Sequence, residues 1–160
     1  MSRSRSRQPG RRQVRGSEAD SAPGAFDVLV AALARSDLTS IELDRRLERA
    51  GFSETARHAA LARADGAGYL DDSRVAIERA QRLADRGASD QAIRVDLGRR
   101  GVPPQAVVEA LASLTPEPER AERLAARLGG GVRSGRTLVR KGFSQDAVDH
   151  ALQSHIADGP

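Results

Sequence analysis

The chain has 160 residues, with no Cys, no Trp, one Tyr and three Phe, and its formal net charge at pH 7 is +4. The absence of Cys excludes disulfides and thiolate metal sites. No apolar run approaches the roughly 18 residues that cross a bilayer. The N-terminus lacks the apolar stretch of a secretory signal, so we expect a cytoplasmic protein with no membrane partner.

Residues 1–24 carry the whole excess of positive charge. They hold six Arg against Glu18 and Asp20, which leaves 20 basic and 20 acidic residues in the rest of the chain. Almost nothing in this segment is apolar, so we predict a disordered basic tail over residues 1–24. Two interpretations stay open, a tail that contacts phosphates and one that only solubilises the chain.

The rest of the chain repeats one pattern three times. Around Gly51, Gly101 and Gly142, a Leu stands four residues before the Gly, an Ala five and nine residues after it, and a Leu ten residues after it. A further Leu precedes each Gly by 18 residues, at Leu33, Leu83 and Leu124. Such a repeat indicates one supersecondary unit per copy. We therefore expect the function of an array rather than that of a single pocket.

The first copy predicts three helices. The apolar residues from Phe26 to Leu33 follow the i, i+3, i+4, i+7 spacing of one helix face. Thr39-Ser-Ile-Glu42 is a capping box that begins a second helix, and Gly51 ends it in the left-handed C′ position. Ser53 is the N-cap of a third helix, which runs to about Asp65.

The second copy repeats this plan. Asp71 and Asp72 begin a helix that runs to about Arg86. Ser89 caps the next helix, which ends at Gly101. The third helix begins at Pro103-Pro104, where Pro is tolerated because the amides of a first turn have no helical partner.

The third copy is interrupted in its middle. Leu124 and Leu128 lie on its first helix, but Gly129-Gly-Gly131 and Gly135 follow. Each Gly forced into a helix costs on the order of 1 kcal/mol. We therefore expect a second helix of about two turns, over roughly residues 134–141, and the least stable of the three copies.

The predicted fold class is all-α, a tandem array of three three-helix units that forms an elongated, curved body behind the disordered tail. The expected units span residues 25–68, 69–115 and 116–160, the third one shortened by its Gly-rich middle. Units of this size are too small to hold a robust core alone, so we expect neighbouring units to share core.

Basic residues gather on the first two helices of each copy. Arg79, Arg82 and Arg86 stand at i, i+3 and i+7 and therefore share one helix face. Arg makes two-pronged contacts to carboxylates or phosphates, which favours a docking strip. A merely solvated face remains the alternative. The candidates for partner binding are Arg79, Arg82, Arg86, Arg94, Arg99, Arg100, Arg140 and Lys141.

A helix ended by Gly and followed by a short turn and a capped helix is also the layout of a DNA-reading helix-turn-helix. Such a module reads bases from the first turns of its last helix. Here these turns carry acids, including Glu54 and Asp146, which repel phosphate. The sequence therefore does not favour sequence-specific DNA recognition.

The densest motif is Gly68-Tyr69-Leu70-Asp71-Asp72. The Gly ends a helix, Tyr and Leu can pack at the junction of the first two copies, and an Asp caps the next helix. Nothing nearby completes a metal or acid–base site, and Gly129-Gly-Gly131 does not follow a strand. We predict no catalytic residue, no metal, no cofactor and no enzyme activity.

The run from Gly68 to Ala76 (Gly-Tyr-Leu-Asp-Asp-Ser-Arg-Val-Ala) resembles the RecX family of bacterial recombinase regulators, and the likeness covers about residues 26–155. It continues downstream of that run and in the other two copies, at Arg86-Gly87, Ile93, Leu97, Arg100-Gly-Val102, Ser36, Glu42-Leu43, Leu47, Gly51-Phe52 and Arg140-Lys-Gly-Phe143.

The resemblance implies a modulator that binds the RecA filament in its helical groove and inhibits ATP hydrolysis and strand exchange in recombination, DNA repair and the SOS response. It implies three tandem three-helix units in a curved rod, in agreement with the repeat. We expect a monomer whose contacts to RecA lie on Arg79, Arg82, Arg86, Arg94, Arg99 and Arg100.

The third copy departs from the family pattern, because its central segment is shorter and rich in Gly. Docking through that copy is therefore an open question. The alternative function is a non-specific DNA-binding module that acts through the Arg tail and the Arg-rich faces, with single- or double-stranded DNA as its partner. A generic helical scaffold is a third hypothesis, against which the Gly68–Asp72 motif weighs.

Overall fold

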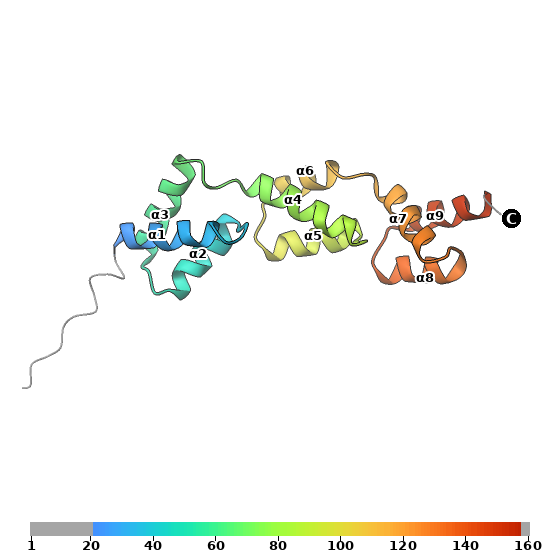
Figure 1. Cartoon of the computed structure of the whole chain (residues 1–160), viewed down its shortest axis with the longest axis horizontal. Helices are drawn as coiled ribbons and strands as arrows, with labels where there is room; N and C mark the ends of the chain where they lie inside the picture. Colours follow the sequence, from blue (N-terminus) through green and yellow to red (C-terminus); the bar gives the residue numbers. More distant parts are fainter. Residues whose placement is uncertain (1–20, 158–160) are drawn as a thin grey trace, which may run out of the picture.

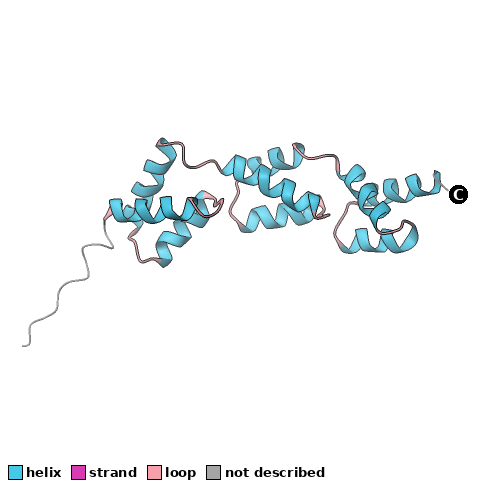
Figure 2. Ribbon diagram, in the orientation of Figure 1, coloured by secondary structure: helices cyan, strands magenta, loops and turns pink. Residues whose placement is uncertain are grey.

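The computed structural model describes residues 21–157, and every regular element in that range is an α-helix. Of the tail predicted over residues 1–24, residues 1–20 lie outside the described residues. The helices form three groups of three in an elongated row (Figures 1 and 2). They are α1 (Ala22–Leu33), α2 (Ser40–Arg49), α3 (Glu54–Gly66), α4 (Asp72–Asp85), α5 (Asp90–Arg99), α6 (Pro104–Ala112), α7 (Glu117–Arg127), α8 (Gly131–Arg140) and α9 (Gln145–Ala157).

The helices begin at the caps that the sequence predicts. The Thr39 hydroxyl accepts from the Glu42 amide at 3.2 Å, and the Glu42 carboxylate accepts from the Thr39 amide at 2.9 Å, which completes the capping box. Ser89 accepts from the Ala92 amide at 3.2 Å and begins α5. Because these signals act within one turn, local sequence is enough to specify them.

Two helix starts differ from the expectation. α1 begins at Ala22 behind the cap Ser21, so residues 22–24 belong to the first helix rather than to the tail. α8 begins at Gly131 and has 10 residues, as many as α2 and α5, so the prediction of a helix over residues 134–141 was wrong. Gly135 lies inside α8 and packs closely on α9, because a Cβ there would lie 3.2 Å from Leu152, which is tighter than most Cβ contacts.

Each unit encloses its own hydrophobic cluster. The cluster of α1–α3 centres on Leu29, Leu43 and Leu47, that of α4–α6 on Ile93 and Leu97, and that of α7–α9 on Leu138 and Phe143. Buried Ala residues let the helices approach closely. The three clusters are separate, so the expectation that units share one core was wrong. The junctions between units depend largely on polar contacts instead.

The second helices of the three units follow one another end to end. The buried Thr39 hydroxyl, at the start of α2, donates to the carbonyl of Arg100 at the end of α5, at 2.7 Å. The buried Ser89 hydroxyl, at the start of α5, donates to the carbonyl of Lys141 at the end of α8, at 2.8 Å. We call this row of α2, α5 and α8, along the lower side of Figure 1, the helix column.

A carboxylate from the following unit completes each junction. Asp72, the first residue of α4, accepts from the Ser40 amide at 2.8 Å. Glu117, the first residue of α7, accepts from the Asp90 amide at 2.7 Å. Both carboxylates stand at a helix N-terminus and bind the N-terminal amide of another helix, where negative charge is favoured. The two junctions therefore use the same chemistry.

We predict that Ser89→Ala destabilises the protein more than Ser53→Ala. Both serines cap a helix, but Ser53 donates no hydrogen bond to another unit in the described structure, whereas Ser89 satisfies the Lys141 carbonyl. Loss of a cap costs about 1 kcal/mol in either variant. The orphaned carbonyl should add about 1–3 kcal/mol in Ser89→Ala alone. Urea denaturation of both variants measures the difference, and equal losses would mean that the inter-unit bond contributes nothing.

Gly101→Ala should likewise destabilise the protein more than Gly51→Ala. Both glycines have positive φ, 78° and 88°, so Ala costs about 1–2 kcal/mol at either position. A Cβ on Gly101 would also lie 2.8 Å from Ile41, whereas nothing stands within 4 Å of a Cβ on Gly51. We expect an additional loss of about 1–3 kcal/mol at Gly101. Thermal denaturation of the double variant Gly101→Ala/Ile41→Ala tests the cause, because truncation of Ile41 removes the overlap.

Candidate partner-binding surface

Every carboxylate on the helix column has a cationic partner from another element or unit. The partners come from the third helix of unit 1, from the first helices of units 2 and 3, and from the end of α5. The pairs are Glu42–Arg100, Asp44–Arg57, Glu48–Arg57, Asp90–Arg120 and Asp96–Arg79. Each negative charge on the helix column is therefore compensated by a neighbouring Arg.

The Glu42–Arg100 pair joins units 1 and 2. Arg100 donates from Nε and Nη2 to the two carboxylate oxygens, each at 2.8 Å, and from Nη2 to the Asp37 carbonyl at 2.8 Å. Burial raises the pKa of Glu42, but the hydrogen bonds from Arg100 and from the Thr39 backbone, with the guanidinium charge, outweigh it. The pKa of Glu42 therefore lies below its ordinary value of 4.5. Arg100 therefore links units 1 and 2 through these hydrogen bonds.

The Arg79–Asp96 pair joins α4 to α5 within unit 2. Arg79 donates from Nε at 2.9 Å and from Nη2 at 2.8 Å to the two oxygens of Asp96, the two-pronged geometry that Arg favours. These hydrogen bonds lower the pKa of Asp96 against the opposing effect of burial, and the charges of Arg79, Arg100 and Arg99 lower it further. Asp96 stays ionised and its charge is compensated by Arg79.

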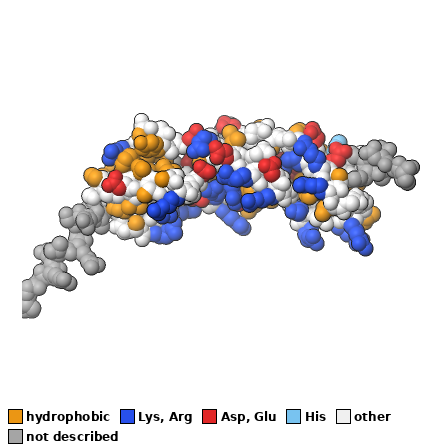
Figure 3. Space-filling view, viewed as in Figure 1, with side chains coloured by type: hydrophobic (Ala, Val, Ile, Leu, Met, Phe, Trp, Pro, Cys, Tyr) orange, Lys and Arg blue, Asp and Glu red, His pale blue; other side chains and the backbone are white. Residues whose placement is uncertain are grey.

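Apart from Arg100, the cations of the column are exposed and have no carboxylate partner within residues 21–157. Blue side chains project along the lower edge of Figure 3, where Figure 1 places α2, α5 and α8. We call these residues the basic strip, which consists of Arg45, Arg46, Arg49, Arg94, Arg99, Arg133, Arg136, Arg140 and Lys141.

The structure divides the cations that the sequence singled out. Arg94, Arg99, Arg140 and Lys141 lie on the basic strip, and Arg86 is exposed at the end of α4. Three others pair with carboxylates of the described chain, namely Arg79 with Asp96, Arg100 with Glu42, and Arg82 with Asp37 and Glu78 at 3.7 and 3.8 Å. Three of the eight candidates therefore have carboxylate partners, and the other five have none among the described residues.

Sequence reasoning missed the cations of α2. Arg49 stands two residues before Gly51, as Arg99 and Arg140 stand two residues before Gly101 and Gly142. The column places these three equivalent Arg residues at the ends of α2, α5 and α8. The repeat itself carried the signal, because a side chain at the same offset in every copy lies at the same position of every unit.

The Gly68–Asp72 motif makes the first junction. Gly68 follows α3 with φ 72°, Leu70 packs against the hydrophobic cluster of unit 1, and the Asp71 carboxylate caps α4 by accepting from the Arg74 amide at 2.8 Å. Tyr69 is 53% exposed and lines a cleft of about 400 Å³ between units 1 and 2. With Asp72 bonded to Ser40, the motif is a connector in this structure.

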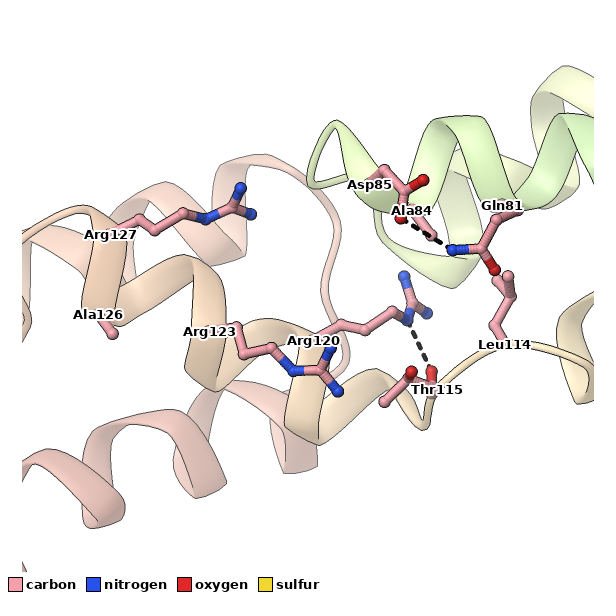
Figure 4. Close-up of a pocket in the computed structure, with 9 residues that line it drawn as sticks. All are labelled: Gln81, Ala84, Asp85, Leu114, Thr115, Arg120, Arg123, Ala126 and Arg127. Carbon is pink, nitrogen blue, oxygen red and sulfur yellow. Dashed lines mark hydrogen bonds between the residues drawn. The ribbon is translucent and has the colours of Figure 1, made fainter.

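Arg120 plays the corresponding role at the second junction, where it links units 2 and 3. Its side chain is buried, and its guanidinium donates to the Thr115 carbonyl at 2.9 Å (Figure 4). It also donates to the Ala88 carbonyl at 2.8 Å and to the Asp90 carboxylate. A buried cation needs such saturation because an unpaired one is strongly destabilising. Arg120 therefore fixes unit 3 on unit 2.

A cleft of about 490 Å³ adjoins Arg120, between α4 and α7 (Figure 4). Arg123 and Arg127 project from α7 on one side. Gln81 and Asp85 face it from α4, where the Gln81 amide donates to Asp85 at 2.8 Å. Within the described part of the chain, no three His, Asp or Glu residues form a group that could hold a metal ion.

Comparison with known proteins identifies relatives that share one name. No protein-family model matches the chain. It is 30% identical over 127 residues to the regulatory protein RecX of Xanthomonas campestris pv. campestris (strain B100), covering 79% of this chain and 70% of the relative. It is 28% identical over 131 residues to the regulatory protein RecX of Stenotrophomonas maltophilia (strain R551-3), covering 76% and 80%.

Two solved structures share the fold. A crystal structure of a regulatory protein RecX matches with a TM-score of 0.70 and 21% identity, over 83% of this chain and 71% of that chain. The crystal structure of RecX from Lactobacillus salivarius matches with a TM-score of 0.73 and 18% identity, over 85% and 97%. The all-helical fold of this chain therefore also occurs in experimentally solved proteins.

We predict that lowering the pH reduces the free energy of unfolding through protonation of Glu42. The pKa of Glu42 is lower in the folded than in the unfolded chain. The carboxylate therefore stabilises the fold fully above about pH 4.5, and this stabilisation is lost as the pH falls through the folded pKa. Glu42→Gln should flatten the fall in unfolding free energy between pH 6 and pH 3. Urea denaturation across this range is the measurement. The control is Glu54→Gln, an exposed carboxylate with no ion pair in residues 21–157, and identical curves for both variants would refute the role of the pair.

Within the described chain no helix is both long and apolar enough to cross a membrane.

Proposed function

The chain belongs to the RecX family of regulatory proteins, and we propose that it regulates a RecA-type recombinase by binding the nucleoprotein filament and inhibiting ATP hydrolysis and strand exchange. The relatives support the first part of this proposal through their name as regulatory proteins. The choice of partner follows from the family resemblance. The geometry of the basic strip supports the mode of binding.

The observation that carries the proposal is the separation of charge on the helix column. Its acids are all paired, while its exposed cations run through all three units. A long surface of one sign fits a long acidic surface better than it fits a small ligand. A nucleoprotein filament offers such a surface, because its subunits and its DNA backbone repeat along one axis.

In this proposal the protein acts by occupying the filament and makes or breaks no covalent bond. An elongated body that contacts several recombinase subunits at once holds them in one arrangement, which opposes the movements of nucleotide turnover and strand exchange. The proposed contacts are Arg86, Arg94, Arg99, Arg140 and Lys141, joined by Arg49 at the equivalent position of unit 1. Arg79, Arg82 and Arg100 serve the contact indirectly, by neutralising the acids beside the strip.

Direct binding of DNA is the second candidate. The same strip suits a phosphate backbone, and residues 1–20 add six Arg. This candidate differs from the first in needing no recombinase. It requires affinity that falls steeply with salt and drops when the N-terminal tail is removed.

We predict that Arg99→Glu/Arg140→Glu raises the concentration needed for half-inhibition of RecA ATP hydrolysis on single-stranded DNA about tenfold or more, because two equivalent contacts become repulsive. Arg127→Glu is the matched control, an exposed Arg of α7 outside the strip with no ion-pair partner among the described residues, and should shift the value by less than about twofold.

Assays of inhibition and of DNA binding with the unsubstituted protein distinguish the two candidate functions. Inhibition at ratios well below one per recombinase monomer supports the filament regulator. Absence of inhibition, together with DNA binding that deletion of residues 1–20 reduces, supports the second candidate. Equal loss in the strip variant and in the control would remove the strip from the explanation.

A further inference from the structure

Unit 3 presents apolar side chains to solvent on the outer side of α8. Val132 and Val139 are 71% and 59% exposed, the two highest values among the large hydrophobic residues that are described. They stand seven residues apart, so they lie on the same face as Gly135 and Arg136. Together with Val148 and Leu152 of α9, this face lines a hollow of about 340 Å³. We call it the α8–α9 hollow.

The other two units explain why Val132 is unpartnered. Its equivalents are Ile41 in α2 and Gln91 in α5, counted from the repeated Gly. Ile41 packs on Gly101 of the next unit, and Gln91 lies against Gly142 of the next unit. α8 has no following unit within the described chain, and an apolar residue still stands at this position. The position equivalent to Val139 holds Glu48 in unit 1 and Gly98 in unit 2, so the second Val is particular to unit 3.

The charge of α8, which forms one wall of the hollow, limits what can cover it. α8 and its C-cap carry Arg133, Arg136, Arg140 and Lys141 and no acidic residue, while α9 carries Asp146 and Asp149. A second copy of the same face would bring Arg against Arg. Residues 1–20 hold six Arg against two acids and would be repelled as well. Both of these occupants are therefore disfavoured by charge.

We propose that the α8–α9 hollow binds an acidic amphipathic helix of a partner protein. Its apolar ridge packs between Val132, Val139 and Leu152, in the way that an amphipathic helix fills a groove between two helices. Its Glu or Asp residues flank the ridge and pair with Arg136 and its basic neighbours on α8. This surface belongs to unit 3 alone, so the inference is independent of the proposed function and goes beyond it.

The test uses the full chain and a fluorescent synthetic peptide of about 20 residues, with Leu along one helix face and Glu on its flanks. Fluorescence anisotropy should show saturable binding of this peptide and none of a peptide with Lys in place of every Glu. Val139→Ser should weaken binding about tenfold, because it removes most of one buried side chain. Val108→Ser is the matched control, since Val108 is 58% exposed on α6 and lies outside the hollow.

Arg136→Glu separates charge from apolar contact. It should weaken binding of the Glu peptide and allow binding of the Lys peptide. The side chains of Val139 and Arg136 are exposed, so their substitution should leave the melting temperature within about 2 °C of the parent value. This measurement verifies that the variants are folded. Failure of the Glu peptide to bind, equal binding of both peptides, or equal loss in Val108→Ser would each overturn the proposal. The assay contains no recombinase, so its failure leaves the proposed function standing, and the reverse also holds.

Discussion

The hydrogen bond from a helix-capping hydroxyl to the end of the next unit's helix is the interaction on which this architecture depends. A Ser or Thr hydroxyl can accept from its own helix and donate elsewhere at the same time. Thr39 and Ser89 use both capacities. An ionised Asp would cap the helix equally well, but it cannot donate, and it would place a negative charge against the negative end of another helix. The junction therefore requires a hydroxyl at this position.

The basic strip follows from this constraint. Once the second helices stand in series, a residue at one offset from the repeated Gly recurs along the column, as Arg49, Arg99 and Arg140 do. The ion pairs that stabilise the column also compensate its negative charges, because Arg79 and Arg100 bind the carboxylates that lie among these cations. The same ion pairs therefore contribute to the fold and to the net charge of the surface. A body whose 20 basic and 20 acidic residues balance presents a positive face only through such segregation.

Local signals predicted most of the fold. The Thr39 capping box and the left-handed Gly residues specify helix ends through contacts within one turn, and the structure contains them as expected. The start of α8 was predicted too late because Gly129, Gly130 and Gly131 were counted only as helix breakers, whereas their positive φ lets the chain turn directly into a helix that begins at Gly131. The partners of Arg79 and Arg100 could not be predicted, because they stand 17 and 58 residues away and only tertiary structure brings them together. Arg49 could have been found from the repeat.

The outer ends of units 1 and 3, as described, lack the groups that form the internal junctions. Each internal junction needs a hydroxyl cap on one unit and a carboxylate on the first residue of the next unit's first helix. The N-cap of α8 is Gly130, which offers no side-chain cap, and α1 begins with Ala22 where α4 and α7 begin with Asp72 and Glu117. Head-to-tail stacking of two copies through these helices would therefore lack both polar contacts of the junction. The hydroxyl and carboxylate of the internal junctions thus specify which units stack on one another.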